Sequence, residues 1–342
     1  MRTSVRLGTM AASAGLIAAA LTAAPVTTSA SPASPAAQQT VKTNFALFAN
    51  GYGTRVQGGA LPAGSDGTAF SAIACTVRAG VERGNHEAEV TVPGLGTLSA
   101  VRTRLWTEKK GAVVSSYSTH RIAEIILGES SMGKLSIEGV RSLSRAYHDG
   151  NRFRTQSETE VAKIVFTPSG GEAQVLAIPT PGQPIVVPGL ARIAVGNTVS
   201  KSITDGVRVS SDALDIQVFP TDTRVRIAHT AAKIQRGAPF GTFRGYSAGV
   251  RARALADNVS VGRTPLSLMP CKGTKGVVKH KAIAHVDLGG QAIVRGLDSE
   301  QMGRQRPGFA TAYELGNVAK INLGDGALVV NAIVGKANVT RK

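Results

Sequence analysis

The alternation of apolar and polar residues over short segments constrains the fold of this chain most. In "TRVRIAH" (223–229), Val225 and Ile227 alternate with arginines, and "KLSIEGV" (134–140) and "ALDIQVF" (213–219) have the same two-residue period. This period places alternate side chains on opposite faces of a β-strand. Gly- and Pro-rich turns such as "TVPGLGT" (91–97) separate the segments. We therefore predict an all-β, sandwich-like fold with little helix.

The chain also resembles itself. Residues 51–148 align with 245–342 at offsets of 193 to 196, and "GKLSIEGVRSLSRA" (133–146) falls on "GALVVNAIVGKANV" (326–339). Strands rich in Gly, Ala and Val resemble one another by composition alone, but four collinear blocks favour a duplication. The predicted order is A–B–A′, with β repeat A at 44–149, a different central β segment B at 150–240, and β repeat A′ at 241–342.

The two cysteines, Cys75 in "SAIACT" and Cys271 in "SLMPCKGT", occupy equivalent places in the two repeats. In an exported protein, the simplest prediction for two cysteines is a disulfide between them. Two buried free thiols, or pairing between chains in a swapped dimer, are the alternatives.

The N-terminus has the features of a secretory signal peptide. Arg2 and Arg6 precede an apolar, Ala-rich run over 8–24, and Thr28-Ser29-Ala30 is a plausible cleavage site. The run is shorter than the roughly 20 residues that span a bilayer. We predict a signal peptide at 1–30, a flexible leader at 31–43, no transmembrane anchor, and a secreted protein that is at most loosely associated with the cell envelope.

Several segments resemble the choice-of-anchor P family of secreted actinobacterial proteins. They are "GYGTRV" (51–56), "SAIACT" (71–76), "PCKGTKG" (270–276) and the Pro-containing stretch 179–197. The resemblance implies an exported, β-rich protein and supplies no activity, cofactor or catalytic residue. Relatives end in varied surface anchors, and the C-terminal "NAIVGKANVTRK" lacks such a tail, which puts surface attachment in doubt.

The chain is strongly basic, with 39 Lys and Arg against 22 Asp and Glu and a net charge of +17. Charge of this size favours anionic partners, although it also serves solubility. Basic residues spaced by two share one strand face. The candidates for polyanion binding are Arg102 and Arg104, Arg224 and Arg226, Arg251 and Arg253, and Lys279 and Lys281. The alternative is ordinary solvent-facing residues that deter edge-to-edge aggregation.

Signals for catalysis are weak. "GESSMG" (128–133) has Met132 where a G-x-S-x-G nucleophile elbow needs glycine. The six histidines lack zinc-binding spacing, so we predict no metal, no cofactor and no catalytic residue. Aromatic residues make up 4% of the chain, which argues against a dedicated nucleic-acid platform.

We therefore expect a non-enzymatic, exported protein that associates with anionic cell-wall polymers or a membrane surface through a basic face. One alternative is a structural or adhesive protein that binds through β-edges or apolar surfaces. A less favoured one is an extracellular hydrolase, which a pocket joining His229 or His120 to a carboxylate would support. The sequence leaves the oligomeric state open.

Overall fold

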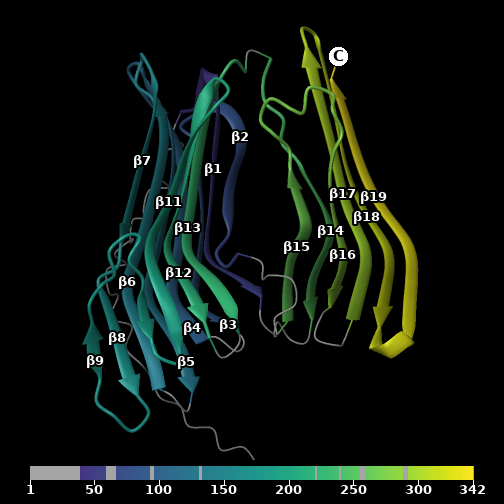
Figure 1. Ribbon diagram of the computed structural model, residues 1–342. Helices are drawn as coiled ribbons and strands as arrows, with labels where there is room; N and C mark the ends of the chain where they lie inside the picture. The colour runs from purple at the N-terminus through teal and green to yellow at the C-terminus, as the bar shows by residue number, and fades with distance from the viewer. Residues whose placement is uncertain are drawn as a thin grey trace, which may run out of the picture. The chain divides into compact units, whose positions relative to one another are not determined.

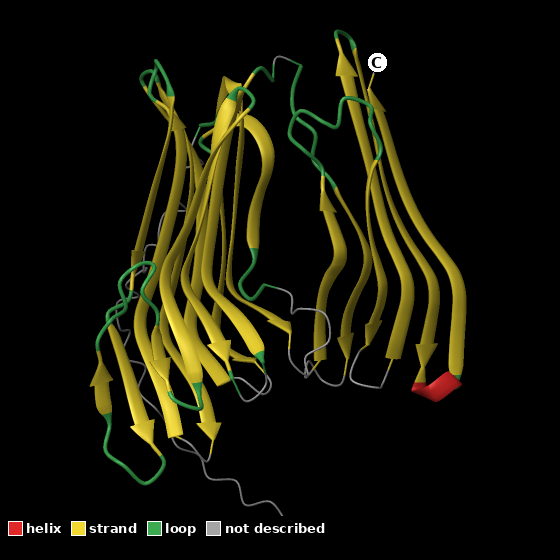
Figure 2. Cartoon of the chain, in the orientation of Figure 1, coloured by secondary structure: helices red, strands yellow, loops and turns green. Residues whose placement is uncertain are grey.

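The computed structural model describes residues 39–58, 67–92, 96–130, 133–219, 222–238, 240–254, 259–287 and 292–341. Within these ranges nearly all residues lie in antiparallel strands, and a single 3-10 turn, η1 (Gly324–Gly326), interrupts them (Figures 1 and 2). The predicted all-β, sandwich-like fold is confirmed. The predicted signal peptide lies outside the described residues. Strand β1 begins at Val41, so the end of the predicted leader is already strand.

The first sheet has the order β3-β4-β5-β6-β8-β9, and β7 pairs with the other half of β6. Strands β7 and β8 follow one another along β6, so together they act as one interrupted neighbour. The strands are β3 (Glu82–Val92), β4 (Gly96–Lys110), β5 (Val113–Ser130), β6 (Gly133–His148), β7 (Phe153–Glu160), β8 (Lys163–Pro168) and β9 (Gln174–Leu176).

The second sheet has the order β10-β11-β12-β13-β1-β2. Its first four strands come from the central part of the chain, and its last two come from the N-terminal part. They are β10 (Ile185–Val187), β11 (Ala191–Ile203), β12 (Gly206–Val218), β13 (Thr223–Arg236), β1 (Val41–Gly58) and β2 (Ser71–Ala79).

The C-terminal part forms a hairpin and a third sheet. The hairpin joins β14 (Tyr246–Ala254) to β15 (Val259–Leu268). The third sheet has the order β16-β17-β18-β19, with β16 (Lys279–Asp287), β17 (Ala292–Arg306), β18 (Phe309–Leu323) and β19 (Leu328–Arg341).

The largest core cluster joins the inner faces of the first two sheets. Leu135 and Ile137 of β6 are buried with Leu214, Ile216 and Ile227 of the second sheet. These are the apolar members of the alternating segments, which confirms that their period of two marks the buried face. A smaller cluster around Leu297 and Val318 forms the core of the C-terminal part, with Val250 packed against it.

Hydroxyl side chains occupy another part of the space between the first two sheets. Ser116 and Ser118 of β5 each donate a 2.7 Å hydrogen bond to a backbone carbonyl of β1, those of Phe48 and Asn50. Ser142 bonds Thr230 at 2.8 Å. Because serine and threonine side chains are small, the two sheets can approach closely here, and each of these buried hydroxyl groups has a hydrogen-bond partner.

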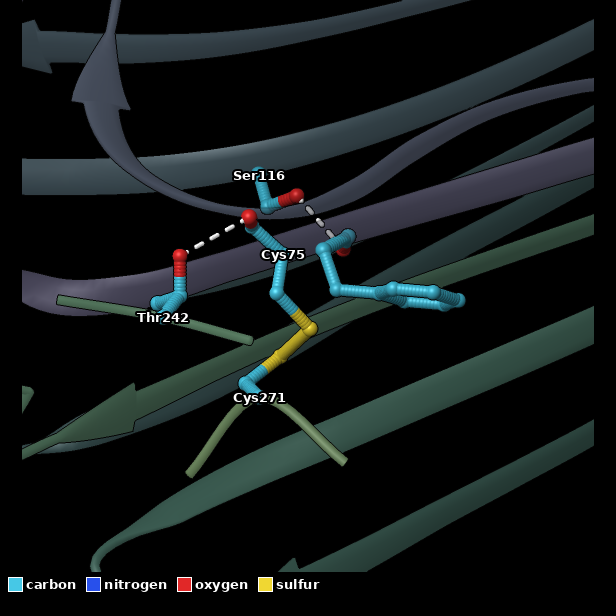
Figure 3. The surroundings of a disulfide bond; sticks show 5 residues. Cys75, Ser116, Thr242 and Cys271 are labelled. Atoms are coloured by element: carbon cyan, nitrogen blue, oxygen red, sulfur yellow. Dashed lines mark hydrogen bonds between the residues drawn. A yellow bond between two sulfur atoms is a disulfide. The ribbon is translucent and has the colours of Figure 1, made fainter. Parts of the chain in front are cut away.

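The predicted disulfide is present (Figure 3). Cys75 of β2 and Cys271, just after β15, are both buried, and their Cα atoms are 5.2 Å apart. Thr242 donates a hydrogen bond of 2.9 Å to the carbonyl oxygen of Cys75, and the backbone nitrogen of Phe243 donates one of 3.0 Å to that of Cys271. The bond therefore ties the N-terminal strands to the C-terminal part of the chain.

Candidate functional site: an arginine row beside an aromatic ladder

The predicted basic pairs lie on different sheets. Arg102 and Arg104 are on β4 of the first sheet, and the other pairs lie on β13 (Arg224, Arg226), β14 (Arg251, Arg253) and β16 (Lys279, Lys281). Arg224 forms a bidentate ion pair with Asp215 of β12. The structure therefore does not gather the four pairs on one sheet face.

Arg102 instead belongs to a row of cations that runs across the first sheet. In the strand register, His86 of β3 is opposite Arg102, Arg102 is opposite Arg121 of β5, and Arg121 is opposite Arg141 of β6. Glu160 of β7 ends the row opposite Arg141. We call Arg102, Arg121 and Arg141 the arginine row.

The arginine row lies on the outer face, because the neighbouring residues Val101, Ile122 and Val140 are buried in the core. Arg102 and Arg121 are exposed, and the side chain of Arg141 retains 34% of its accessible surface. Directly opposite like charges destabilise a sheet by a few tenths of a kcal/mol up to about 1 kcal/mol per pair.

The arginine row is only partly neutralised. Arg141 contacts Glu160 at 3.3 Å. Among the described residues, neither Arg102 nor Arg121 forms an ion pair. Glu124 and Glu138 lie on the next outward positions of β5 and β6, but they contact Ser136 and Lys163. The row thus carries a positive charge that the protein leaves largely uncompensated at its centre.

An aromatic ladder lies on the same face, on the other side of the arginine row. The rings of Trp106 and Tyr117 stack with centroids 4.4 Å apart. The guanidinium of Arg104 lies 5.2 Å from the Trp106 ring, and that of Arg145 lies 5.0 Å from Tyr117 and 4.1 Å from Tyr147. Guanidinium groups over aromatic faces at these distances make favourable cation–π contacts.

Local contacts hold the ladder in place. Arg104 forms an ion pair of 2.7 Å with Glu82, which raises its pKa. Arg145 donates to the buried hydroxyl of Ser115. Partial burial raises the pKa of the Tyr117 phenol, so Tyr117 stays neutral near pH 7. The rings and guanidinium groups therefore hold one another in place on the outer face of the sheet.

Sequence reasoning missed most of this surface. Arg121 of β5 and Arg141 and Arg145 of β6 do not belong to basic pairs spaced by two along their strands, and their positions relative to one another depend on the register between strands. Trp106 stands in no motif that the sequence offers. The two-residue period did place Arg102 and Arg104 correctly on a water-facing side.

One histidine, His229, pairs with a carboxylate. His229 contacts Asp212 at 2.6 Å, and Tyr52 stacks on its ring with centroids 4.5 Å apart. Burial and the Asp212 charge raise the pKa of Tyr52 to about 12. Among the described side chains, no serine, threonine or cysteine hydrogen-bonds to His229. The structure thus joins His229 to a carboxylate and shows no hydroxyl or thiol bonded to that histidine among the described side chains.

Comparison of the chain with protein-family models, curated proteins and solved structures gave no match. Within the part of the chain that the structure describes, no helix is long and apolar enough to cross a membrane.

The aromatic ladder contains the only tryptophan of the chain, so its fluorescence reports on this face alone. We expect the emission of Trp106 to change in wavelength or intensity when dextran sulfate is added, and the change to disappear at high salt. The variant Trp106→Phe supplies the blank. An emission spectrum that stays constant while dextran sulfate binds would place the binding surface elsewhere.

Proposed function

We propose that this protein is exported and associates with anionic polymers of the cell envelope through the outer face of the first sheet. The arginine row is the observation that supports this proposal best. Three arginines directly opposite one another repel, and a bound polyanion would offset that repulsion with several simultaneous contacts. Such contacts are electrostatic and weaken as salt screens them.

The shape of the surface favours a linear, extended ligand. The arginine row crosses the strands, with the aromatic ladder on one side and the carboxylates of Glu124 and Glu138 on the other. A chain with regularly spaced carboxylate or phosphate groups could follow the row. Trp106 and Tyr117 would border such a chain, since their faces are already occupied by each other and by the guanidinium groups of Arg104 and Arg145.

The proposal is tested by co-sedimentation of the purified protein with isolated cell envelopes over a salt series. In Arg102→Gln/Arg121→Gln, we expect binding at low salt to weaken about 30-fold, since a cation at an anionic surface contributes about 1 kcal/mol. The matched control is Lys279→Gln/Lys281→Gln, which removes the same charge from the third sheet. Its binding should stay close to that of the unaltered protein.

Stability provides an independent readout of the same variants. Because Arg102 and Arg121 oppose one another, replacing both should leave the melting temperature unchanged or raise it slightly. Loss of binding with a retained melting temperature therefore locates the effect at the surface. Equal loss in both double variants would indicate a response to net charge alone, and unchanged binding in both would contradict the electrostatic mechanism.

A further inference from the structure

The three parts of the chain contain the same four-strand pattern. Each four-stranded run has residues with positive φ in its second and fourth strands: Ala100 and Gly139 in β3–β6, Gly196 and Ala228 in β10–β13, and Gly296 and Ala332 in β16–β19. At these places the register steps over an alanine of the third strand, namely Ala123, Ala213 or Ala319. These matching positions, where one residue of each strand is left out of the pairing and the register is unchanged, indicate three related units, including the central segment.

The first two units complete each other's sheets. Strand β1, which precedes the first run, pairs with β13, the last strand of the second run. Strands β7 and β8, which precede the second run, pair with β6, the last strand of the first run. Each unit thus donates its leading strand to the other, and both last strands become internal strands of a sheet.

The third unit has the same parts but no such exchange. Strand β14 corresponds to β1, because Ser247 pairs with Ser267 as Gly51 pairs with Ser71, at one offset of 196. Strand β19 corresponds to β6. Among the described strands, β14 pairs only with β15, and β19 pairs only with β18.

The side chains of β19 are built for a covered position. In β6, Ile137 and Val140 lie on either side of Gly139 and are at most 1% exposed. The corresponding Val330 and Ile333 of β19 lie on either side of Ala332 and are 37% and 38% exposed. Leu328 and Val339, at the two ends of the same face, are more exposed still, at 54% and 69%. A long apolar edge strand left open invites pairing with another chain.

Two open cavities lie beside these strands. One of about 560 Å³ has Val250 of β14 and Ile333 of β19 in its wall, and one of about 490 Å³ has Tyr246 of β14 and Val339 of β19. In the first two units, β13 pairs with β1 and contacts β5 and β6, so the last strand of one unit covers the space beside the leading strand of the other. The third unit therefore lacks the strand and the apolar cover that its relatives receive.

We infer that the third unit binds the third unit of a second copy, exchanging leading strands as the first two units do. Strand β14 of each chain pairs antiparallel with β19 of the other, which gives a two-fold symmetric interface. The second copy is the occupant that fits, because it alone supplies both missing elements at once. The edges of β6 and β13 are already occupied by β7–β8 and β1.

The register of this exchange follows from the second sheet. There, Gly51 pairs with Thr230 and Thr54 with Ile227, which are the buried residues of β13 on either side of Ala228, as Val140 and Ile137 are in β6. The corresponding residues place Ser247 opposite the partner copy's Ile333, and Val250 opposite the partner copy's Val330. Directly opposite residues of antiparallel strands have Cα atoms about 4.5–5.5 Å apart, which is within the reach of a disulfide.

Light scattering after size-exclusion chromatography tests the association. We expect twice the mass of one chain for the unaltered protein and the mass of one chain for Val330→Lys/Ile333→Lys. The matched control is Val329→Lys/Val334→Lys, which alters the opposite face of β19 and should remain dimeric. Circular dichroism should show all three proteins folded. A monomeric unaltered protein at micromolar concentration would overturn the inference.

Cross-linking tests the register. Under mild oxidation, Val250→Cys/Val330→Cys should form a covalent dimer that reductant dissolves. The control Val250→Cys/Val339→Cys places the second thiol nine residues further along β19, about 30 Å away, and should not cross-link. Dimers that form equally in both variants, or in neither, would reject the proposed pairing. Envelope binding plays no part in either experiment, so the outcome is independent of the proposed function.

Discussion

Reduction of the Cys75–Cys271 bond is expected to lower the free energy of unfolding by up to about 5 kcal/mol. The two cysteines are 196 residues apart, and the chain-entropy model assigns about that value to a loop of this length. The loop is long because the bond joins β2 to the turn after β15. Reduction therefore releases the constraint on the whole central part of the unfolded chain at once.

Thermal unfolding with and without reductant measures this effect. We expect reduction to lower the melting temperature by roughly 10 °C, given a shift of about 2–4 °C per kcal/mol in domains of somewhat smaller size. The variant Cys75→Ala/Cys271→Ala should melt at the reduced temperature in both buffers. An unchanged melting temperature after complete reduction, verified by mass after alkylation, would contradict the prediction.

Loss of the disulfide would also affect the residues that are packed around it. Cys75 and Cys271 pack with Ala46 and Ala238 in a small buried cluster. Phe48 and Val77 pack against this cluster, and the disulfide is a covalent link across it. Lys272, next to Cys271, adds an ion pair of 3.2 Å to Asp205, and an exposed pair of that kind contributes little.

Much of the architecture was accessible from the sequence, because burial has a period. The alternation in 134–140 and 223–229 identified strands and their inner faces, and the predicted export made a disulfide the simplest use of two cysteines. The central segment was expected to differ from the repeats. The positive φ at Gly196 and Ala228 supports the inference that it shares their pattern, a relation expressed in backbone conformation rather than in residue identity.

The candidate site was mostly beyond sequence reasoning for a related reason. Arg121 and Arg141 are 20 residues apart and become neighbours only because the β5–β6 hairpin sets their register. Basic pairs within one strand can be read from the sequence. Which basic residues become neighbours across a sheet depends on how the strands pair. The same applies to Trp106 and Tyr117, which stack across β4 and β5. Although aromatic residues are scarce in the chain as a whole, several of them lie together on this face.

His120 is expected to make the fold sensitive to acid. Its side chain is fully buried between the sheets, and its Nδ1 lies 2.8 Å from the hydroxyl of Thr103. That hydroxyl donates its proton to the carbonyl of Ala69 at 2.7 Å, so Nδ1 carries the hydrogen of the neutral imidazole and donates it to Thr103. Nε2 faces the interior with no hydrogen-bond partner among the described residues.

Protonation at Nε2 would therefore place an unsolvated charge in the core. Burial, assisted by the nearby His229, lowers the pKa of His120 to about 3. The unfolded chain keeps the ordinary value of about 6.5. Below pH 6.5 the unfolded state binds a proton that the folded state does not, so this contribution to stability is complete above pH 6.5 and is lost as the pH falls toward 3.

Denaturant unfolding at a series of pH values measures the loss, which we expect to approach 1.4 kcal/mol per pH unit from this residue. His120→Asn keeps a donor toward Thr103 and removes the titration. It should be less stable than the unaltered protein at pH 7, because it leaves part of the buried space empty, but the difference should shrink steadily between pH 6 and pH 4. Parallel stability curves for the two proteins over that range would show that His120 binds its proton equally in both states, and would refute the burial argument.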